Sequence, residues 1–449
     1  MTDRKDPERN RFSARAGRMA SVGANLAGAA LSFGANSMFG SAEGDERIAR
    51  ALKEALGRSK GPLMKVAQML STIPDFLPEE YASELAGLQA HAPSMGWAFV
   101  QRRMRAELGD DWGGRFTAFG REAAHAASLG QVHKAKLHDG RFVACKLQYP
   151  DMASAVEADL SQLHALMGLF KRVDGAIDPD DMFEEIADRL REELEYEREA
   201  KLMALYANIL SDSPNVVTPE PIRELSTQRL LTMTWLDGQG LSSFQDAPQE
   251  VRNRIARLLF EAWWGPLTSH AVIHGDPHLG NYSLTPEAEQ LNLIDFGCVR
   301  IFPPSFIAGV VALKHALERD DFEGTREAYR IWGFENLTND LVETLNIWAR
   351  FIYGPLMDDR VRTVADGVAP GAYGRKEAFA VRKRLKEVGG VKVPREFVFM
   401  DRAAIGLGAA YLRLGAEINF YEMFETRIEG FDEVAVGQRQ SEALQKVGL

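Results

Sequence analysis

The chain has very little cysteine and no excess of positive charge. Only Cys145 and Cys298 occur among its 449 residues, which are too few for a disulfide framework. A secreted, disulfide-stapled fold is therefore excluded, and a reducing compartment such as the cytoplasm is expected. The formal net charge of −11 argues against binding to a phosphate backbone, so we expect no nucleic-acid partner.

Long hydrophobic runs are also absent. The stretch from Met19 to Ala42 carries no charge and is long enough to span a bilayer, but alanine, glycine and polar residues dominate it. Six basic residues precede this stretch: Arg4, Lys5, Arg9, Arg11, Arg15 and Arg18. We expect residues 1–44 to be a basic, small-residue segment that lies on a membrane surface as a peripheral contact or packs on the rest of the protein, with a disordered linker as the alternative.

Two short motifs near the middle of the chain indicate phosphate chemistry. The segment His274-Gly275-Asp276-Pro277-His278-Leu279-Gly280-Asn281 is followed by Leu293-Ile294-Asp295-Phe296-Gly297. This order and spacing are typical of kinases, in which the first aspartate takes or orients the proton of the attacking group. The sequence thus predicts Asp276 as catalytic and Asn281 and Asp295 as Mg²⁺ ligands, because Mg²⁺ prefers hard oxygen donors.

A kinase also needs a phosphate-binding lysine, and the sequence offers one at Lys146. Residues 124–146 predict strand, turn and strand, with Asp139-Gly140 at the hairpin. The alternative is an ordinary surface lysine on an edge strand. The usual glycine-rich loop is missing, since Ala126, Ala127 and Ser128 stand where it belongs. Alanine lacks the φ > 0 freedom of glycine, so this nucleotide-binding loop is expected to be stiffer.

These motifs together resemble the AarF/UbiB family of atypical kinases, which is tied to ubiquinone and other isoprenoid-lipid metabolism. The resemblance rests on residues 126–150, on the two motifs above and on two further segments. Residues 61–71 are similar to the family's K-x-G-Q helix, with Ala67 in place of the glycine, and residues 192–200 are similar to its E-x-D element, with Glu195 in place of the aspartate.

The resemblance implies roles for five further residues. Lys65 and Gln68 would reach into the nucleotide site, Lys65 as a catalytic-site residue and Gln68 as a nucleotide contact. Glu193 and Glu195 would engage Lys65 or a metal ion, and Glu199 would pair with Lys146. Independently of the family, the glutamates of residues 192–199 are expected to crowd one helix, where several would need cationic or metal partners; a solvated helix face is the alternative.

The expected fold is α+β: a bilobal, protein-kinase-like fold with an N-terminal helical extension that carries the K-x-G-Q-type motif. The predicted divisions are a basic segment (1–44), the extension (45–110), a small lobe (111–236) and a helical large lobe (237–449). Residues 150–201 are expected to be helical, as is the chain from Val251 onward. The last small-lobe strand would run into a hinge at Met233–Leu236, whose backbone would meet adenine.

The resulting functional expectation is an Mg-ATP-dependent atypical kinase or ATPase that supports isoprenoid-quinone biosynthesis or lipid homeostasis. Its partners would be ATP, isoprenoid lipid or quinone intermediates and quinone-biosynthesis enzymes, and its location the cytoplasm or the inner face of the membrane. Residues 300–305 lead almost directly into an apolar helix, leaving no peptide-docking segment, so protein phosphorylation is not expected. The alternatives are a small-molecule kinase of the aminoglycoside or choline type and a nucleotide-binding scaffold.

Overall fold

The computed structural model describes residues 95–449 except 128, 174–179, 277, 369–372 and 390. Within this part the chain forms two compact units. The first contains the described residues up to Phe170 together with Phe183–Tyr196 and Ile222–Thr232, and the second contains the remainder. The predicted Lys65–Gln68 helix and the N-terminal basic segment lie outside the described residues.

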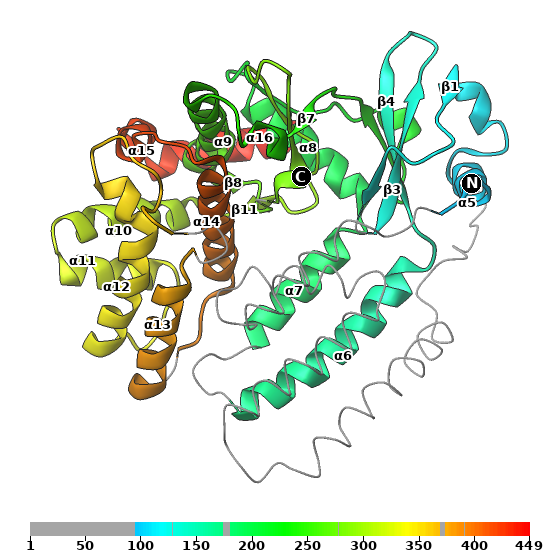
Figure 1. The fold of residues 1–449 in the computed structure, drawn as a ribbon. Helices are drawn as coiled ribbons and strands as arrows, with labels where there is room; N and C mark the ends of the chain where they lie inside the picture. The colour runs from blue at the N-terminus through cyan, green and yellow to red at the C-terminus, as the bar shows by residue number, and fades with distance from the viewer. Residues whose placement is uncertain (1–94, 128, 174–179, 277, 369–372, 390) are drawn as a thin grey trace. The chain divides into compact units, whose positions relative to one another are not determined.

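The first unit is built on a five-stranded sheet next to a helix. Its strands follow the order β1-β3-β4-β6, with β2 paired to the other end of β3 (Figure 1). The elements are α5 (Trp97–Leu108), η2 (Trp112–Arg115), β1 (Ala118–Phe119), β2 (His125–Ala127), β3 (Gly130–Lys136), β4 (Phe142–Gln148) and β6 (Leu230–Thr234). The predicted strand–turn–strand is confirmed. The edge-strand alternative is wrong, because β4 has a neighbour on each side.

The core of the first unit explains which way β4 faces. Val143, Cys145 and Leu147 are fully buried in one apolar cluster, together with Val100 and Met104 of α5. Side chains alternate between the two faces of a strand, so the residues between them point to the opposite face. This alternation places Lys146 away from the apolar core of the unit.

Three helices follow the β3–β4 hairpin, as expected for residues 150–201: α6 (Met152–Val173), α7 (Asp180–Glu192) and α8 (Tyr196–Ile209). The expectation of a single helix for the glutamate cluster is wrong, since α7 ends at Glu192 and α8 starts at Tyr196. The amide of Gln148 donates to the carbonyl of Leu194 at 3.0 Å, and this tertiary bond holds the intervening turn.

The second unit combines short strands with many helices. Helix α9 (Gln249–His270) is followed by four strands: β8 (Val272–Ile273), β9 (Tyr282–Leu284), β10 (Leu291–Leu293) and β11 (Arg300–Ile301). The expectation of a purely helical chain after Val251 is therefore wrong. β10 pairs with β9 and with β5 (Val216–Val217), β7 (Gln239–Gly240) pairs with β9, and β11 pairs with β8. Apart from the β9–β10 pair, these pairings join segments that are far apart in the sequence.

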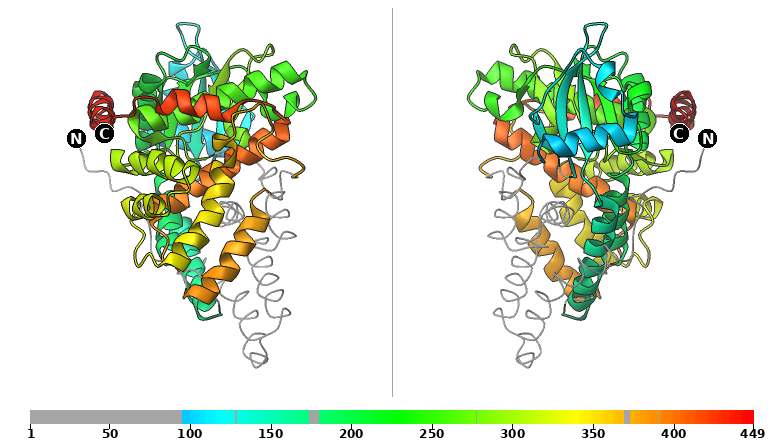
Figure 2. Two further views of the ribbon diagram at one scale, coloured as in Figure 1. Left: turned by 90° about the vertical axis from the view of Figure 1, so that its left-hand side faces the viewer. Right: turned by 90° about the vertical axis from the view of Figure 1, so that its right-hand side faces the viewer.

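Helices make up the rest of this unit. They are α10 (Pro304–Glu318), α11 (Phe322–Ile331), α12 (Asn339–Tyr353), α13 (Arg375–Val388), α14 (Arg395–Leu414), α15 (Phe420–Ile428) and α16 (Glu433–Val447), with 3₁₀ turns at η4 (Leu241–Phe244), η5 (Leu279–Asn281) and η6 (Gly354–Met357). The remaining 3₁₀ turn of the described residues, η3 (Arg223–Leu225), belongs to the first unit. α10 packs on α11 and α12 on α13 (Figure 2). No helix among the described residues is sufficiently long and apolar to cross a bilayer.

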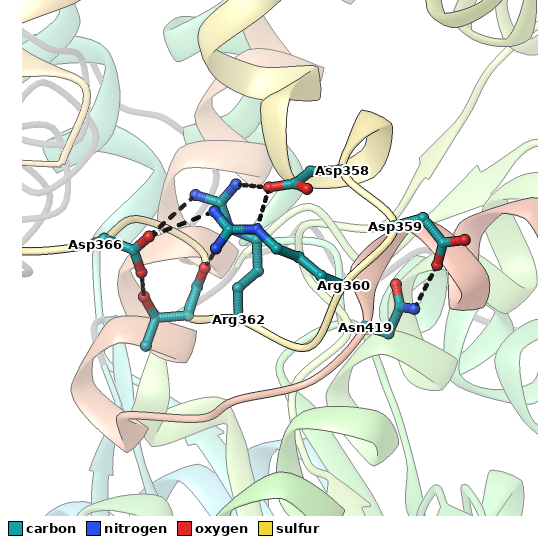
Figure 3. A network of polar contacts seen from close by, with 7 residues as sticks. Asp358, Asp359, Arg360, Arg362, Asp366 and Asn419 are labelled. Atoms are coloured by element: carbon teal, nitrogen blue, oxygen red, sulfur yellow. Dashed lines mark hydrogen bonds and ion pairs between the residues drawn. The ribbon is translucent and has the colours of Figure 1, made fainter.

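An ion-pair network orders the loop that follows η6 (Figure 3). Arg360 and Arg362 both pair with Asp358, and both lie 3.8 Å from Asp366. The backbone of Arg362 also exchanges two hydrogen bonds with Ile418. These bonds tie the loop to the segment between α14 and α15.

Candidate functional site

In the first unit, the candidate phosphate-binding lysine lies in the middle of β4. Lys146 is half-buried and lies opposite Val132 of β3. Its Nζ lies 5.2 Å from the centre of the Tyr196 ring, over the ring face. A cation at this distance is attracted by the negative face of the ring. The strand and the ring together therefore define where the ammonium group lies.

The alanine loop is a tight hairpin. Ala126 and Ala127 belong to β2 and pair with Gln131 and Gly130 of β3, while Ser128 lies outside the described residues. A Cβ on Gly130 would lie 2.3 Å from the carbonyl oxygen of Leu147, so only glycine fits there. The single glycine of this loop is required by backbone packing. The role of the loop in nucleotide binding stays a prediction.

The predicted acidic residues occupy the turn between α7 and α8. Glu193 is half-buried and Glu195 exposed, and the backbone N–H of each donates to a carbonyl of the last turn of α7. Glu199 is buried in α8, three residues after Tyr196, a spacing that puts two side chains on the same helix face. Glu193 and Glu195 belong to the first unit, whereas Asn281 and Asp295 belong to the second, so a shared metal site stays a prediction.

In the second unit, hydrogen bonds join the residues of the first motif. The N–H of Asp276 donates to the carbonyl of His274 at 2.6 Å. The carbonyl of Asp276 accepts from the side-chain amide of Asn281 at 3.3 Å and from the Tyr282 hydroxyl at 3.4 Å. Gly275 has φ 58°, a left-handed conformation that favours glycine at the turn.

The second motif is attached directly to the first. The N–H of Ile294 donates to the carbonyl of Asn281 at 3.1 Å, and His274 Nε2 lies 2.5 Å from the main-chain oxygen of Asp295. The Asp295 carboxylate accepts from the N–H of Gly297 at 3.0 Å. The structure therefore brings Asp276, Asn281 and Asp295 into one hydrogen-bonded framework.

His274 is the centre of this framework. A carbonyl can only accept, so Nε2 carries the proton, and Nδ1 has no hydrogen-bond partner among the described residues. Burial lowers the pKa of His274 and keeps the ring neutral. Four aromatic side chains surround it: Tyr206, Trp263, Tyr282 and Phe296. His274, Asp276 and His278 could also be interpreted from the sequence as a zinc site, but their place in the motif favoured structural and phosphate roles; the carbonyl of Asp295 as the partner of His274 was not predicted.

The residues just before and including Asn281 form a capped 3₁₀ turn. The Nδ1 atom of His278 accepts from the N–H of Gly280 at 3.1 Å and caps η5, which carries Asn281. A Cβ on Gly280 would approach this atom to 2.9 Å. His278 is exposed, and in this structure it shapes the turn.

The remaining predicted contacts are less defined. Met233 is buried at the end of β6 and Leu236 is half-buried beyond it, but no observation tests adenine binding there. Lys65 and Gln68 lie outside the described residues. Cys145 and Cys298 are both buried. Trp263 is buried as well, and its indole N–H donates to the Tyr282 hydroxyl at 2.8 Å.

The framework suits a hard divalent cation. Asp295 offers a carboxylate and Asn281 an amide oxygen, and because Asn281 Nδ2 donates to Asp276, the amide oxygen is directed to the other side of the group. Such oxygen donors fit Mg²⁺. In the part of the chain that is described, no three His, Cys, Asp or Glu residues cluster as a metal site.

The comparisons with known proteins agree with these motifs. A model of the ABC1 atypical kinase-like domain matches residues 87–329, more than half of the chain. The chain is 32% identical over 308 residues to the mitochondrial atypical kinase coq-8 of Caenorhabditis elegans, covering 65% of this chain and 40% of that protein. It is 28% identical over 264 residues to the mitochondrial atypical kinase COQ8 of Saccharomyces cerevisiae, covering 59% and 52%. The chain thus spans about half the length, or less, of these relatives.

The solved structures include a similar fold. The structure of Rv3197 from Mycobacterium tuberculosis, described as a complex with erythromycin, has a TM-score of 0.59 and 26% identity, covering 87% of this chain and 98% of that one. The fold is accordingly a mixed α+β, protein-kinase-like fold. The family match includes Lys146, Asp276, Asn281 and Asp295, and on this basis the chain belongs to the ABC1 atypical kinase-like family.

Proposed function

We propose that this protein binds Mg-ATP and acts as an atypical kinase or ATPase. The observation that carries the proposal is the framework in which His274, Asn281 and the Asp295 backbone hold both acidic motifs in fixed positions. A bound Mg²⁺ ion would neutralise phosphate charge. Asn281 and Asp295 would hold it, Asp276 would take or orient the proton of the attacking hydroxyl or water, and Lys146 would bind the α and β phosphates.

Thermal unfolding with and without Mg-ATP tests nucleotide binding, because a ligand that binds only the folded state raises the melting temperature. We expect a shift in the parent protein that Lys146→Ala reduces and Asp295→Asn abolishes. Asp110→Asn is the matched control, since Asp110 lies in an exposed ion pair with Arg105. No nucleotide-dependent shift in the parent would contradict the proposal.

We further propose that the activity supports ubiquinone or other isoprenoid-quinone biosynthesis, or lipid homeostasis, at the inner face of the membrane. Support comes from the family alone, whose mitochondrial relatives are named atypical kinases COQ8. Isoprenoid intermediates and quinone-biosynthesis enzymes would be its partners. The quinone profile of a deletion strain, complemented by the parent or by Asp295→Asn, tests this. An unchanged profile in the deletion strain would refute it.

The backbone after Asp295 favours a substrate other than protein. β11 pairs with β8, and the N–H of Phe302 donates to the carbonyl of Ala271 at 2.8 Å, so this segment is held in place up to α10. A small-molecule kinase remains the second candidate. Lys65→Ala separates the two: altered ATP turnover in a folded protein favours the atypical kinase, and unchanged turnover and affinity favour the small-molecule kinase.

A further inference from the structure

Tyr196 lies against the candidate phosphate-binding lysine. Its ring centre is 5.2 Å from Lys146 Nζ, and only 1% of the residue is exposed. Tyr196 is the first residue of α8, immediately after the turn that carries Glu195. The ring is therefore fixed by burial, whereas the lysine has four rotatable bonds.

The same ring contacts the start of β3. A Cβ on Gly130 would lie 3.0 Å from the hydroxyl oxygen of Tyr196, so the absence of a side chain at Gly130 leaves room for this hydroxyl. Gly130 pairs with Ala127, the last residue of β2. The Tyr196 side chain thus lies next to both Gly130 of β3 and Lys146 of β4.

The turn before Tyr196 is itself attached to β4. Gln148, two residues after Lys146, is buried, and its amide donates to the carbonyl of Leu194 at 3.0 Å. The carbonyl of Gln148 in turn accepts from the Arg103 side chain at 3.1 Å. Hydrogen bonds of Gln148 therefore join β4 to α5 and to the turn that precedes Tyr196.

We propose that Tyr196 is a positioning residue for Lys146, and this proposal rests on the proposed role of Lys146 in binding ATP phosphates. The ring face attracts the ammonium group and restricts its rotamers, so less side-chain freedom is lost when phosphate binds. The contact needs the aromatic face and not the hydroxyl. Tyr196→Phe should therefore preserve the positioning of Lys146, whereas an aliphatic residue in place of Tyr196 should not.

A double-mutant cycle measured by Mg-ATP titration tests whether Tyr196 acts through Lys146. We expect Tyr196→Leu to weaken binding roughly 2- to 30-fold, the range for a cation–π contact, and Tyr196→Phe to change it less than about twofold. In a Lys146→Met background, Tyr196→Leu should have no further effect. An equal loss in both backgrounds, or no loss in the parent, would overturn the proposal. Tyr196→Met is the replacement if Tyr196→Leu does not fold.

Two controls separate this role from general stability and from the proposed function. Tyr329→Leu removes an equally buried tyrosine of α11 and should lower the melting temperature without changing ATP affinity. NMR spectra of carbon-13-labelled lysine in the protein without nucleotide should show one signal shifted by an aromatic ring. Lys146→Met should remove this signal, and Tyr196→Leu should return it to the chemical shift of an ordinary lysine. Absence of that signal overturns the positioning contact, whereas its presence with no ATP binding by the parent overturns the proposed function instead.

Discussion

The imidazole of His274 donates to the main-chain carbonyl of Asp295 across 2.5 Å, and this bond joins two motifs that are 21 residues apart. Because it binds the backbone of Asp295, it fixes the aspartate while leaving the carboxylate to other partners. The carboxylate position is then set by the N–H of Gly297. The alignment of the two motifs therefore depends on a neutral, buried histidine.

His274→Phe should weaken Mg-ATP binding and lower the melting temperature. The ring is replaced by one of similar size, but the buried carbonyl of Asp295 loses its donor, at a cost of about 1–3 kcal/mol. Titration of Mg-ATP and thermal unfolding measure the two effects. His138→Phe, at an exposed position in the first unit, is the control. Parent-like ATP affinity in a folded His274→Phe protein would show that the bond does not align the site.

Asp401→Asn should change how stability depends on pH. Burial raises the pKa of Asp401 to about 7, while Trp348 donates to its carboxylate. The folded state therefore binds more protons than the unfolded state between about pH 4 and 7, so this group's contribution to stability falls as pH rises through that window. Asparagine keeps an acceptor for the indole and does not titrate.

Melting temperatures of Asp401→Asn and the parent from pH 5 to 8 measure this effect. We expect the variant to gain on the parent as pH rises and the difference to level off above about pH 7. Burial lowers the pKa values of His270 and His274, so their contributions to stability rise with pH, opposite to that of Asp401. Both histidines are present in the variant and in the parent, so the difference in melting temperature between the two proteins removes their contributions. Parallel profiles, like those expected for the exposed Asp110→Asn, would contradict the prediction.

Gly130→Ala should destabilise the first unit. The added methyl would lie 2.3 Å from the carbonyl oxygen of Leu147, and backbone cannot move away cheaply. Overpacking of this kind costs about 1–3 kcal/mol or more. Gly114→Ala is the matched control, since its Cβ would meet nothing within 4 Å. Thermal unfolding of both variants decides, and equal melting temperatures would refute the packing argument.

Arg362→Ala should cost more stability than Arg360→Ala, although both arginines pair with the same aspartates (Figure 3). The Arg362 side chain is 18% exposed and also donates to the carbonyl of Thr363, whereas that of Arg360 is 58% exposed. We expect a loss of about 1–2 kcal/mol for Arg362→Ala and no measurable change for Arg360→Ala. Chemical denaturation measures the free energy of unfolding of both variants. An equal loss would mean that burial does not make the ion pairs of Arg362 more stabilising than those of Arg360.

Deleting residues 1–42 should remove binding to anionic liposomes while ATP binding survives. Each basic residue before Met19 contributes at most about 1 kcal/mol near an anionic surface, and Asp3, Asp6 and Glu8 offset half of the charge. Binding should therefore be reversible and sensitive to salt. Co-sedimentation of the full-length and shortened proteins is the measurement. Equal partitioning of both would show that this segment is not the membrane contact.

The elements that depend only on residues close together in the sequence could be predicted from it. The hairpin from Gly130 to Gln148 followed from alternating side chains and an Asp-Gly turn, and α10 from a continuous apolar run. The break between α7 and α8 could not be predicted, because residues 192–196 contain no glycine or proline and the bond that holds the turn comes from Gln148, 46 residues away. Strands of two or three residues, such as β8 and β10, are too short to show a period.

The candidate site divides in the same way. Asp276, Asn281 and Asp295 were predicted from their spacing, and the structure joins them, although their metal and catalytic roles stay predictions. The function of His274 was missed because its partner is a backbone oxygen, which no sequence pattern reveals. Tyr196 was missed because its contacts with Lys146 and Gly130 depend on how the chain folds back after α7.

The short connection after Gly297 has a consequence for regulation. Only six residues separate it from the start of α10 at Pro304, and β11 within them is paired with β8. There is no surface loop here that could accept a phosphate group and refold around it. A covalent mark placed on this connection would therefore have little free backbone to reorder.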